Sequence, residues 1–217
     1  MNIGVIAEGV SEQTIISYLL ERYLGDVVVN PVEPEINNKG KQVGYGGWMN
    51  VLSVCCSEKF EKILSFNDFI VIQIDTDACE ESGYDIKKTK GANIAKLQSE
   101  IYDEVKDRLL KSLSEGEFNK YKDNIIFAIC IEEIECWLLP LYCTNNDKCK
   151  ITGCIDKLNQ KLHAQGDGHI PEKDKNSPNA QKTYQKILKK LKKKRNIKDC
   201  SVHNYGFNRL ILQLDSL

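Results

Sequence analysis

The chain has 217 residues, of which 41% are hydrophobic and 28% are charged, and its formal net charge is -1. These values are typical of a globular domain with a full core and exclude a disordered chain. No apolar run approaches the roughly eighteen residues of a membrane span, and the amino terminus lacks the basic region of a secretory signal. We therefore expect a cytoplasmic protein without a membrane partner.

The nine cysteines are an odd number in a chain without an export signal. We therefore expect no framework of disulfides and expect most of the cysteines to be reduced. A zinc site is an alternative for some of them, although the chain has no Cys-x-x-Cys pair. Its candidate ligands are Cys143, Cys149, Cys154, His163 and His169.

The first predicted strand, Asn2–Ala7, is apolar and ends at Glu8 and Gly9. Apolar positions at helical spacing then predict a helix from Ser11 to Leu24. Gly9 permits the tight turn between them. Glu12 falls in the first turn of this helix, where an acid also complements the helix dipole.

A second strand is predicted at 27–32, and Pro31 indicates that it lies at or near a sheet edge. The loop that follows is rich in Gly and Asn and carries Lys39 and Lys41. A loop of this length in a compact domain is usually functional or mobile. The residues from Trp48 to Leu64 predict the next helix.

The third predicted strand, Phe69–Asp77, reads FIVIQIDTD and is apolar until its end. Such a run is typical of a parallel strand that is buried on both faces. Asp75 and Asp77 are one strand period apart, so their carboxylates can leave the chain on the same side. Oxygen ligands of this kind suit a hard divalent cation, but Asp-Thr-Asp also occurs in ordinary turns.

The pattern continues with a helix at 92–114 and a fourth apolar strand at 124–131. That strand is followed by Glu132, Glu133 and Glu135, which lead into the short apolar helix IECWLLPLY. Strand and helix thus alternate four times, which predicts an α/β fold with a mostly parallel four-stranded sheet flanked by helices. We assign this domain to residues 1–142 and a helical, basic extension packed on the same domain to residues 143–217.

The extension is predicted to contain a short helix at 154–163, a flexible polar segment at 164–179, a basic helix at 181–194 and a terminal helix at 207–217. Charge runs are usually solvated surfaces, but no acid interrupts the basic residues between 181 and 198. We therefore expect this helix to contact the phosphate backbone of a nucleic acid. The expected contacts are Lys182, Lys186, Lys189, Lys190, Lys193, Lys194 and Arg195.

Acidic residues follow three of the four predicted strands. Because the carboxyl ends of parallel strands meet at one edge of a sheet, these acids should approach one another. Like charges in a partly dehydrated cleft raise one another's pKa, and a bound cation removes that penalty. The sequence therefore predicts a site for Mg²⁺ or Mn²⁺. Its candidate ligands are Glu8, Glu12, Asp75, Asp77, Glu132 and Glu135.

The order of these motifs resembles the Toprim domain of type IA topoisomerases, bacterial primases and overcoming-lysogenisation-defect nucleases. The chain looks most like small free-standing prokaryotic Toprim proteins of the RloB-like kind. Their Glu-Gly-x-Ser/Thr-Glu motif is matched by residues 8–12, and their Glu-x-Trp-Leu-Leu motif by residues 135–139. The resemblance covers residues 2–142.

The resemblance implies a role for several of these acids. Glu8 corresponds to the strand-end glutamate proposed as general acid/base or metal ligand, and Asp75 and Asp77 correspond to the magnesium-binding pair. Glu12 corresponds to a second metal-holding acid in the nucleases. After the fourth strand those nucleases carry Ser-x-Glu, whereas Cys130 occupies the serine position here. A complete two-metal site is therefore not implied.

By this resemblance we expect a metal-dependent endonuclease, with catalysis assigned to Glu8, Asp75, Asp77 and Glu12. It also suggests a role as effector in bacterial defence. The alternatives are a catalytically silent module, a module gated by an ATPase partner subunit, and an RNA-processing ribonuclease. A haloacid-dehalogenase phosphatase is disfavoured because its Asp-x-Asp follows the first strand. A homo-oligomer is compatible with the sequence.

Overall fold

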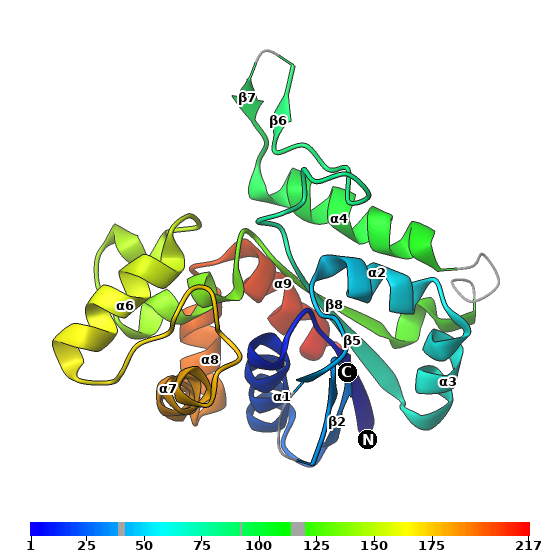
Figure 1. Ribbon diagram of the computed structural model, residues 1–217, viewed down its shortest axis with the longest axis horizontal. Helices are drawn as coiled ribbons and strands as arrows, with labels where there is room; N and C mark the ends of the chain where they lie inside the picture. Colours follow the sequence, from blue (N-terminus) through cyan, green and yellow to red (C-terminus); the bar gives the residue numbers. More distant parts are fainter. Residues whose placement is uncertain (39–41, 92, 114–119) are drawn as a thin grey trace.

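The computed structural model describes residues 1–38, 42–91, 93–113 and 120–217 (Figure 1). Its centre is a four-stranded sheet in which every pairing is parallel. In spatial order the strands are β2 (Val28–Glu33), β1 (Asn2–Ile6), β5 (Phe69–Asp75) and β8 (Ile125–Cys130). The predicted α/β fold is confirmed, and β2, which contains Pro31, is an edge strand as expected.

The first face of the sheet is covered by α1 (Val10–Leu24) and by helices of the carboxyl-terminal part. The apolar stripe of α1 is buried there, as its spacing predicted. The other helices of this layer are α6 (Cys154–Gln165), α7 (Pro178–Leu188) and α8 (Lys194–Ser201). Residues from both parts of the chain thus share one apolar core.

The second face is covered by α2 (Trp48–Cys55), α3 (Glu58–Phe66) and α4 (Gln98–Ser112). Figure 1 shows these helices on the opposite side of the sheet from α1 and α7. Their apolar residues pack on Ile6, Ile70, Ile72 and Phe127 from the strands. The sheet is therefore buried on both faces, which accounts for the nearly continuous apolar sequences of β5 and β8.

The open edge of β8 is covered by α9 (Tyr205–Leu214). The Gln213 side chain accepts a hydrogen bond from the Phe127 amide and donates one to the Phe127 carbonyl, both at 2.9 Å. A Cβ at Gly206 would lie 2.0 Å from the carbonyl oxygen of Ile129, so only glycine allows this approach. The helix thus satisfies backbone groups that an exposed edge would leave unpaired.

Shorter elements complete the fold. Two-stranded antiparallel pairs are formed by β3 (Glu35–Ile36) with β4 (Gln42–Val43) and by β6 (Thr89–Lys90) with β7 (Ile94–Ala95). The 3₁₀ helices are η1 (Lys122–Asn124), η2 (Ile134–Leu141), η3 (Asn146–Cys149) and η4 (Lys189–Leu191). Lys39 and Lys41 of the predicted loop lie outside the described residues.

Several predicted helices have other bounds in the structure. The helix expected from Trp48 to Leu64 is divided into α2 and α3, because Ser57 is extended and occupies the N-cap position of α3. The helix expected at 92–114 begins only at Gln98, where the Glu100 carboxylate accepts a hydrogen bond from the Leu97 amide. Ala92 and Ser114 of the expected helix lie outside the described residues. The basic helix expected at 181–194 is divided into α7, η4 and α8.

The part of the chain that the structure describes has no framework of disulfides and leaves most cysteines reduced, as expected, but Cys136 and Cys154 form one disulfide. This bond joins η2 to the start of α6. Cys154 is therefore not a free zinc ligand, and within the described ranges the zinc alternative finds no cluster that includes the two histidines. In the same part of the chain, no helix has both the length and the apolar character to cross a bilayer.

Candidate functional site

The carboxyl ends of β1 and β5 are joined directly by a side chain. Oε1 of Glu8, two residues beyond β1, accepts a hydrogen bond from the backbone amide of Asp75 at 2.6 Å. Asp75 is the last residue of β5 and is buried, and Glu8 is half-buried. The predicted meeting of the first and third strand ends is therefore observed.

Gln73 holds this arrangement from within the sheet. Its fully buried side chain accepts from the Glu8 amide at 3.1 Å and donates to Oδ1 of Asp75 at 2.7 Å. A buried polar side chain in an apolar strand is stable only when its hydrogen bonds are satisfied. Gln73 thus positions the two acids relative to each other. A single glutamine within an otherwise apolar strand is the feature of the sequence that could have indicated this role.

Asp77 and Glu132 are placed differently from the prediction. Asp77 is exposed, and its Oδ1 accepts from the neighbouring Ala78 amide. Glu132 pairs with Lys88 at 2.8 Å. Its backbone has a φ of 64°, held by Thr76, whose hydroxyl accepts from the Glu132 amide. The structure therefore places the Glu132 carboxylate in an ion pair and leaves Asp77 at the solvent-facing margin.

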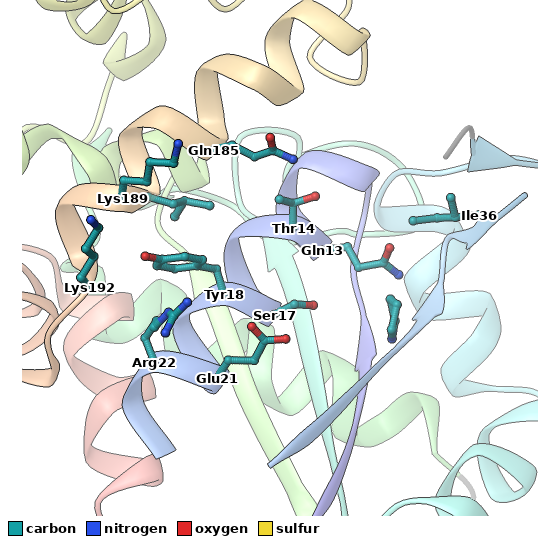
Figure 2. Close-up of a pocket in the computed structure, with 12 residues that line it drawn as sticks. Gln13, Thr14, Ser17, Tyr18, Glu21, Arg22, Ile36, Gln185, Lys189 and Lys192 are labelled. Carbon is teal, nitrogen blue, oxygen red and sulfur yellow. The ribbon is translucent and has the colours of Figure 1, made fainter. Parts of the chain in front are cut away.

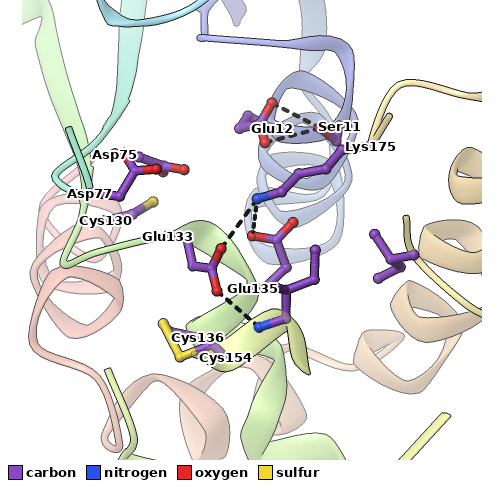
Figure 3. A network of polar contacts seen from close by, with 12 residues as sticks. Ser11, Glu12, Asp75, Asp77, Cys130, Glu133, Glu135, Cys136, Cys154 and Lys175 are labelled. Carbon is purple, nitrogen blue, oxygen red and sulfur yellow. Dashed lines mark hydrogen bonds and ion pairs between the residues drawn. A yellow bond between two sulfur atoms is a disulfide. The ribbon is translucent and has the colours of Figure 1, made fainter. Parts of the chain in front are cut away.

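A second group of acids surrounds Lys175. The Lys175 ammonium lies 2.9 Å from Oε2 of Glu135 and 3.3 Å from Oε2 of Glu133. Figure 3 shows the Lys175 side chain extending between Glu12 on α1 and these two acids. Glu135 is fully buried, and the Tyr184 hydroxyl of α7 donates to its Oε1. Glu135 is thus held by a cation and a hydroxyl from the carboxyl-terminal part.

The segment before α7 fixes Lys175 in this position. Asn176 Oδ1 accepts from the Ser11 amide at 3.2 Å, at the start of α1. The Ser11 hydroxyl in turn donates to the Glu12 carboxylate at 2.9 Å. A Cβ at Gly9 would lie 2.5 Å from Oε2 of Glu12, so a larger residue there would displace the end of the Glu12 side chain. The segment expected to be flexible therefore includes ordered contacts with the site.

Burial and mutual repulsion shift the pKa values of these acids upward. Desolvation by burial raises the pKa of Glu8 to about 8, and the nearby charges of Glu12 and Asp77 add to the rise. Burial raises the pKa of Asp75 well above its ordinary range, and Glu8, Glu12 and Glu135 raise it further. The pKa of Glu12 is raised by burial and by Glu135. In the metal-free protein Glu8 therefore keeps its proton at neutral pH, and a bound cation would favour the ionised carboxylate.

Lys175 supplies part of the missing positive charge. Burial alone would lower its pKa, but the charges of Glu135 and Asp75 outweigh this effect and raise it. The ammonium therefore stays protonated among the carboxylates. We define the acid cluster as Glu8, Glu12, Asp75, Glu133 and Glu135, with Lys175 as its cation.

The acid cluster offers the ligand type that Mg²⁺ and Mn²⁺ prefer, namely carboxylate oxygen. Among the described residues, however, no three of its acids have oxygens that all lie within 4.8 Å of one another. In the described part of the chain, that spacing is met only by Glu133, Cys136 and Cys154, and the two sulfurs are bonded to each other. The donor set fits a divalent cation held by one or two carboxylates, which is the usual protein contribution to Mg²⁺ binding.

The predicted nucleic-acid contacts do not form one surface. Lys182 and Lys186 line a hollow beside Asp174, whereas Lys189 lines a groove against α1. Lys193 is exposed just before α8. The division of the predicted helix at 189–193 turns these residues in different directions.

The remaining members of that set have acidic partners. Lys190 pairs with Asp167 at 3.3 Å and lies 4.0 Å from the centre of the Tyr142 ring. Lys194 lies 3.8 Å from Asp215, and Arg195 lies 3.7 Å from Asp199. Acids of the same chain therefore compensate part of the charge of Lys190, Lys194 and Arg195.

In EDTA, the melting temperature of the wild-type protein is expected to fall as pH rises from about 5 to about 8. Glu8 has an ordinary pKa of 4.5 and a folded-state pKa of about 8. A raised pKa means that the folded state binds more protons, so its stabilising contribution is complete below pH 4.5 and is lost as pH rises through about 8. Glu8→Gln should therefore flatten the profile in a thermal scan across pH. The control Glu104→Gln should keep the wild-type dependence of melting temperature on pH. A Glu8→Gln profile that also runs parallel to the wild type would contradict the prediction.

Removing the disulfide with Cys136→Ser and Cys154→Ser is expected to cost about 3 kcal/mol of stability. The bond closes a loop with a sequence separation of 18. Urea unfolding of the oxidised protein measures the effect, and the wild type treated with dithiothreitol should lose the same amount. If reduction leaves the wild-type midpoint unchanged, the bond does not stabilise the fold.

Comparisons of the chain with protein-family models, curated proteins and solved structures found no match.

Proposed function

We propose that the chain is a metal-dependent nuclease that hydrolyses phosphodiester bonds in nucleic acid with Mg²⁺ or Mn²⁺. The observation that carries the proposal is the bond between Glu8 and the Asp75 amide. It brings together acids from two neighbouring strand ends, beside Glu12. Burying like charges in this way is unfavourable unless a cation binds among them. The resemblance of these residues to the Toprim motifs supports the same activity.

Glu8 and Asp75 would hold the cation directly, and Glu12 and exposed Asp77 would contribute from the margin of the site. When bound, the cation supplies positive charge that stabilises the transferring phosphoryl group. Gln73 orients Asp75 through its amide. Lys175 limits the repulsion between Glu135 and Glu12 and would add positive charge near a phosphate bound at the acid cluster.

Glu8 also has the properties of a general acid/base. Its pKa of about 8 in the metal-free protein lies near neutral pH, where a side chain can both accept and release a proton. Oε1 accepts from the Asp75 amide, so Oε2 is the atom at which a proton is exchanged. Glu8 can thus take a proton from the attacking water or deliver one to the leaving oxygen.

Incubation of the purified protein with Mn²⁺ and three substrates tests the proposal. The substrates are supercoiled plasmid, single-stranded DNA and transfer RNA, and the products are separated by electrophoresis. We expect cleavage of at least one substrate, its loss in EDTA and its loss in Glu8→Gln. Glu104→Gln changes a partly exposed acid on α4 that pairs with Lys96 and lies apart from the acid cluster, and this variant should cleave as the wild type does. Cleavage that survives Glu8→Gln, or a wild type inactive on all three, contradicts the proposal.

A further inference from the structure

A groove of about 660 Å³ lies between α1 and the α7–η4 segment, apart from the acid cluster. Figure 2 shows Tyr18 and Arg22 on α1 facing Lys189 and Lys192 across it. On its other side the groove is bounded by β2 and β3 through Pro31 and Ile36.

Three cations line this groove, namely Arg22, Lys189 and Lys192. All three are exposed, and none has an acidic partner within ion-pair distance among the described residues. Their basic neighbours Lys190 and Lys194, by contrast, have such partners. Three cations without an ion-pair partner among the described residues thus lie around this groove, together with a single exposed acid, Glu21. Lys182, Lys186 and Lys193, which also lack such a partner there, do not line it. This charge balance suits a polyanion.

The groove also contains an aromatic platform. Tyr18 is half-buried, and the Arg22 guanidinium lies 5.3 Å from the centre of its ring. Hydroxyl and amide side chains at Thr14, Ser17 and Gln185 line the same space. An aromatic ring with flanking cations and neutral hydrogen-bonding groups is the arrangement that binds single strands, with a base on the ring and phosphates on the cations.

The groove follows the helix that leads away from the acid cluster. Its lining on α1 extends from Gln13 to Arg22, and Glu12 of the cluster immediately precedes this stretch. Ten helical residues span roughly 14 Å, at 1.5 Å each. That length accommodates about four stacked nucleotides, with one charge per 3.4 Å of strand. A strand in the groove would thus run along α1 toward the site.

We propose that this groove binds a single strand of nucleic acid, with a base stacked on Tyr18 and phosphates on Arg22, Lys189 and Lys192. The proposal rests on the proposed nuclease function and names its substrate class as single-stranded. Arg22, Tyr18 and Lys192 were not among the residues expected from sequence, because the groove is formed by two helices far apart in the chain.

Fluorescence anisotropy of labelled twenty-nucleotide dT and U strands, in EDTA so that nothing is cleaved, tests the groove. Lys189→Glu with Lys192→Glu is expected to weaken binding at least tenfold and to lower the salt slope by about 1.4, at about 0.7 per phosphate contact. Tyr18→Ala is expected to weaken it roughly fivefold to a hundredfold, and Tyr18→Phe should bind as the wild type does. Circular dichroism confirms that each variant is folded.

The matched control is Lys62→Glu with Lys111→Glu, which makes the same charge change on exposed positions of α3 and α4. The binding affinity of this control should fall less than twofold. An equal loss in the control, a larger loss on reversing Lys182 and Lys186, or tighter binding of duplex than of single strands would overturn the proposal. A wild type that binds no strand would also overturn it. Cleavage is measured separately. If the groove variants bind as the wild type does but cleavage still depends on Glu8, only the groove proposal is refuted and the proposed function is not.

Discussion

Asp75→Asn is expected to reduce metal-dependent cleavage on the order of 10³-fold, which corresponds to about 4 kcal/mol of transition-state stabilisation. Asparagine has nearly the same shape and can still accept the hydrogen bond from Gln73. The variant should therefore fold. Its cleavage activity should fall because the negative charge that holds the cation is gone. Initial cleavage rates with Mn²⁺, at saturating substrate, measure the effect.

The same substitution should make the metal-free protein more stable. Asp75 is buried, and its pKa is raised by burial and then by Glu8, Glu12 and Glu135. Its folded-state pKa lies above its unfolded value, so its stabilising contribution is present at low pH and lost as pH rises. Asparagine does not titrate, so the increase in the free energy of unfolding over the wild type should be larger at pH 8 than at pH 5. At pH 8 it should be about 1–3 kcal/mol.

The opposite effect is expected in the presence of the cation. Mn²⁺ at about one hundred times its dissociation constant should stabilise the wild type by about 2.7 kcal/mol and Asp75→Asn by little. The measurement is urea unfolding with EDTA and with Mn²⁺, and Glu104→Gln is the control. If Asp75→Asn is stabilised by Mn²⁺ as strongly as the wild type, the cation does not bind at this acid.

Lys175→Met is expected to destabilise the metal-free protein by about 3–5 kcal/mol, the cost of removing one partner from a buried ion pair. The Glu135 side chain is 0% exposed and the Lys175 side chain 22% exposed, so water replaces the lost charge poorly. Glu133 loses the same partner. Urea unfolding in EDTA measures the change, and Lys173→Met, an exposed lysine two residues earlier, should change stability by less than about 0.5 kcal/mol.

A second substitution separates lost charge from lost packing. Glu135→Gln added to Lys175→Met should recover a large part of the stability, because it removes the uncompensated carboxylate. Mn²⁺ should also stabilise Lys175→Met more than the wild type, since the cation then meets less competition from the ammonium. A double variant no more stable than Lys175→Met alone would show that the ion pair is not the source of the loss.

The fold was predictable because parallel strands buried on both faces have a distinctive sequence. β5 and β8 are apolar along almost their whole length, and α1 has its buried residues at helical spacing. The meeting of Glu8 with Asp75 followed from the same reasoning, because parallel strands end at one edge. These features depend on local pattern and on a general rule of topology.

The rest of the site depends on contacts between distant segments. Lys175 lies in a polar stretch that reads as a loop, and only the folded chain brings its ammonium to Glu135. The Cys136–Cys154 disulfide likewise depends on where α6 packs. Glu132 seemed equivalent to Glu8, but Lys88 binds it instead. No local pattern specifies such pairings, because each is decided by tertiary packing.

The metal centre is tested most directly by titrating the metal-free protein with Mn²⁺ at pH 8 and following the loss of the electron paramagnetic resonance signal of the free ion. The wild type and Glu104→Gln should bind one or two Mn²⁺ ions, and Glu8→Gln and Asp75→Asn should each lose at least one of them. A wild type that leaves the free-ion signal unchanged, or variants at Glu8 and Asp75 that bind Mn²⁺ as the wild type does, would contradict the claim that these strand-end acids form a metal centre.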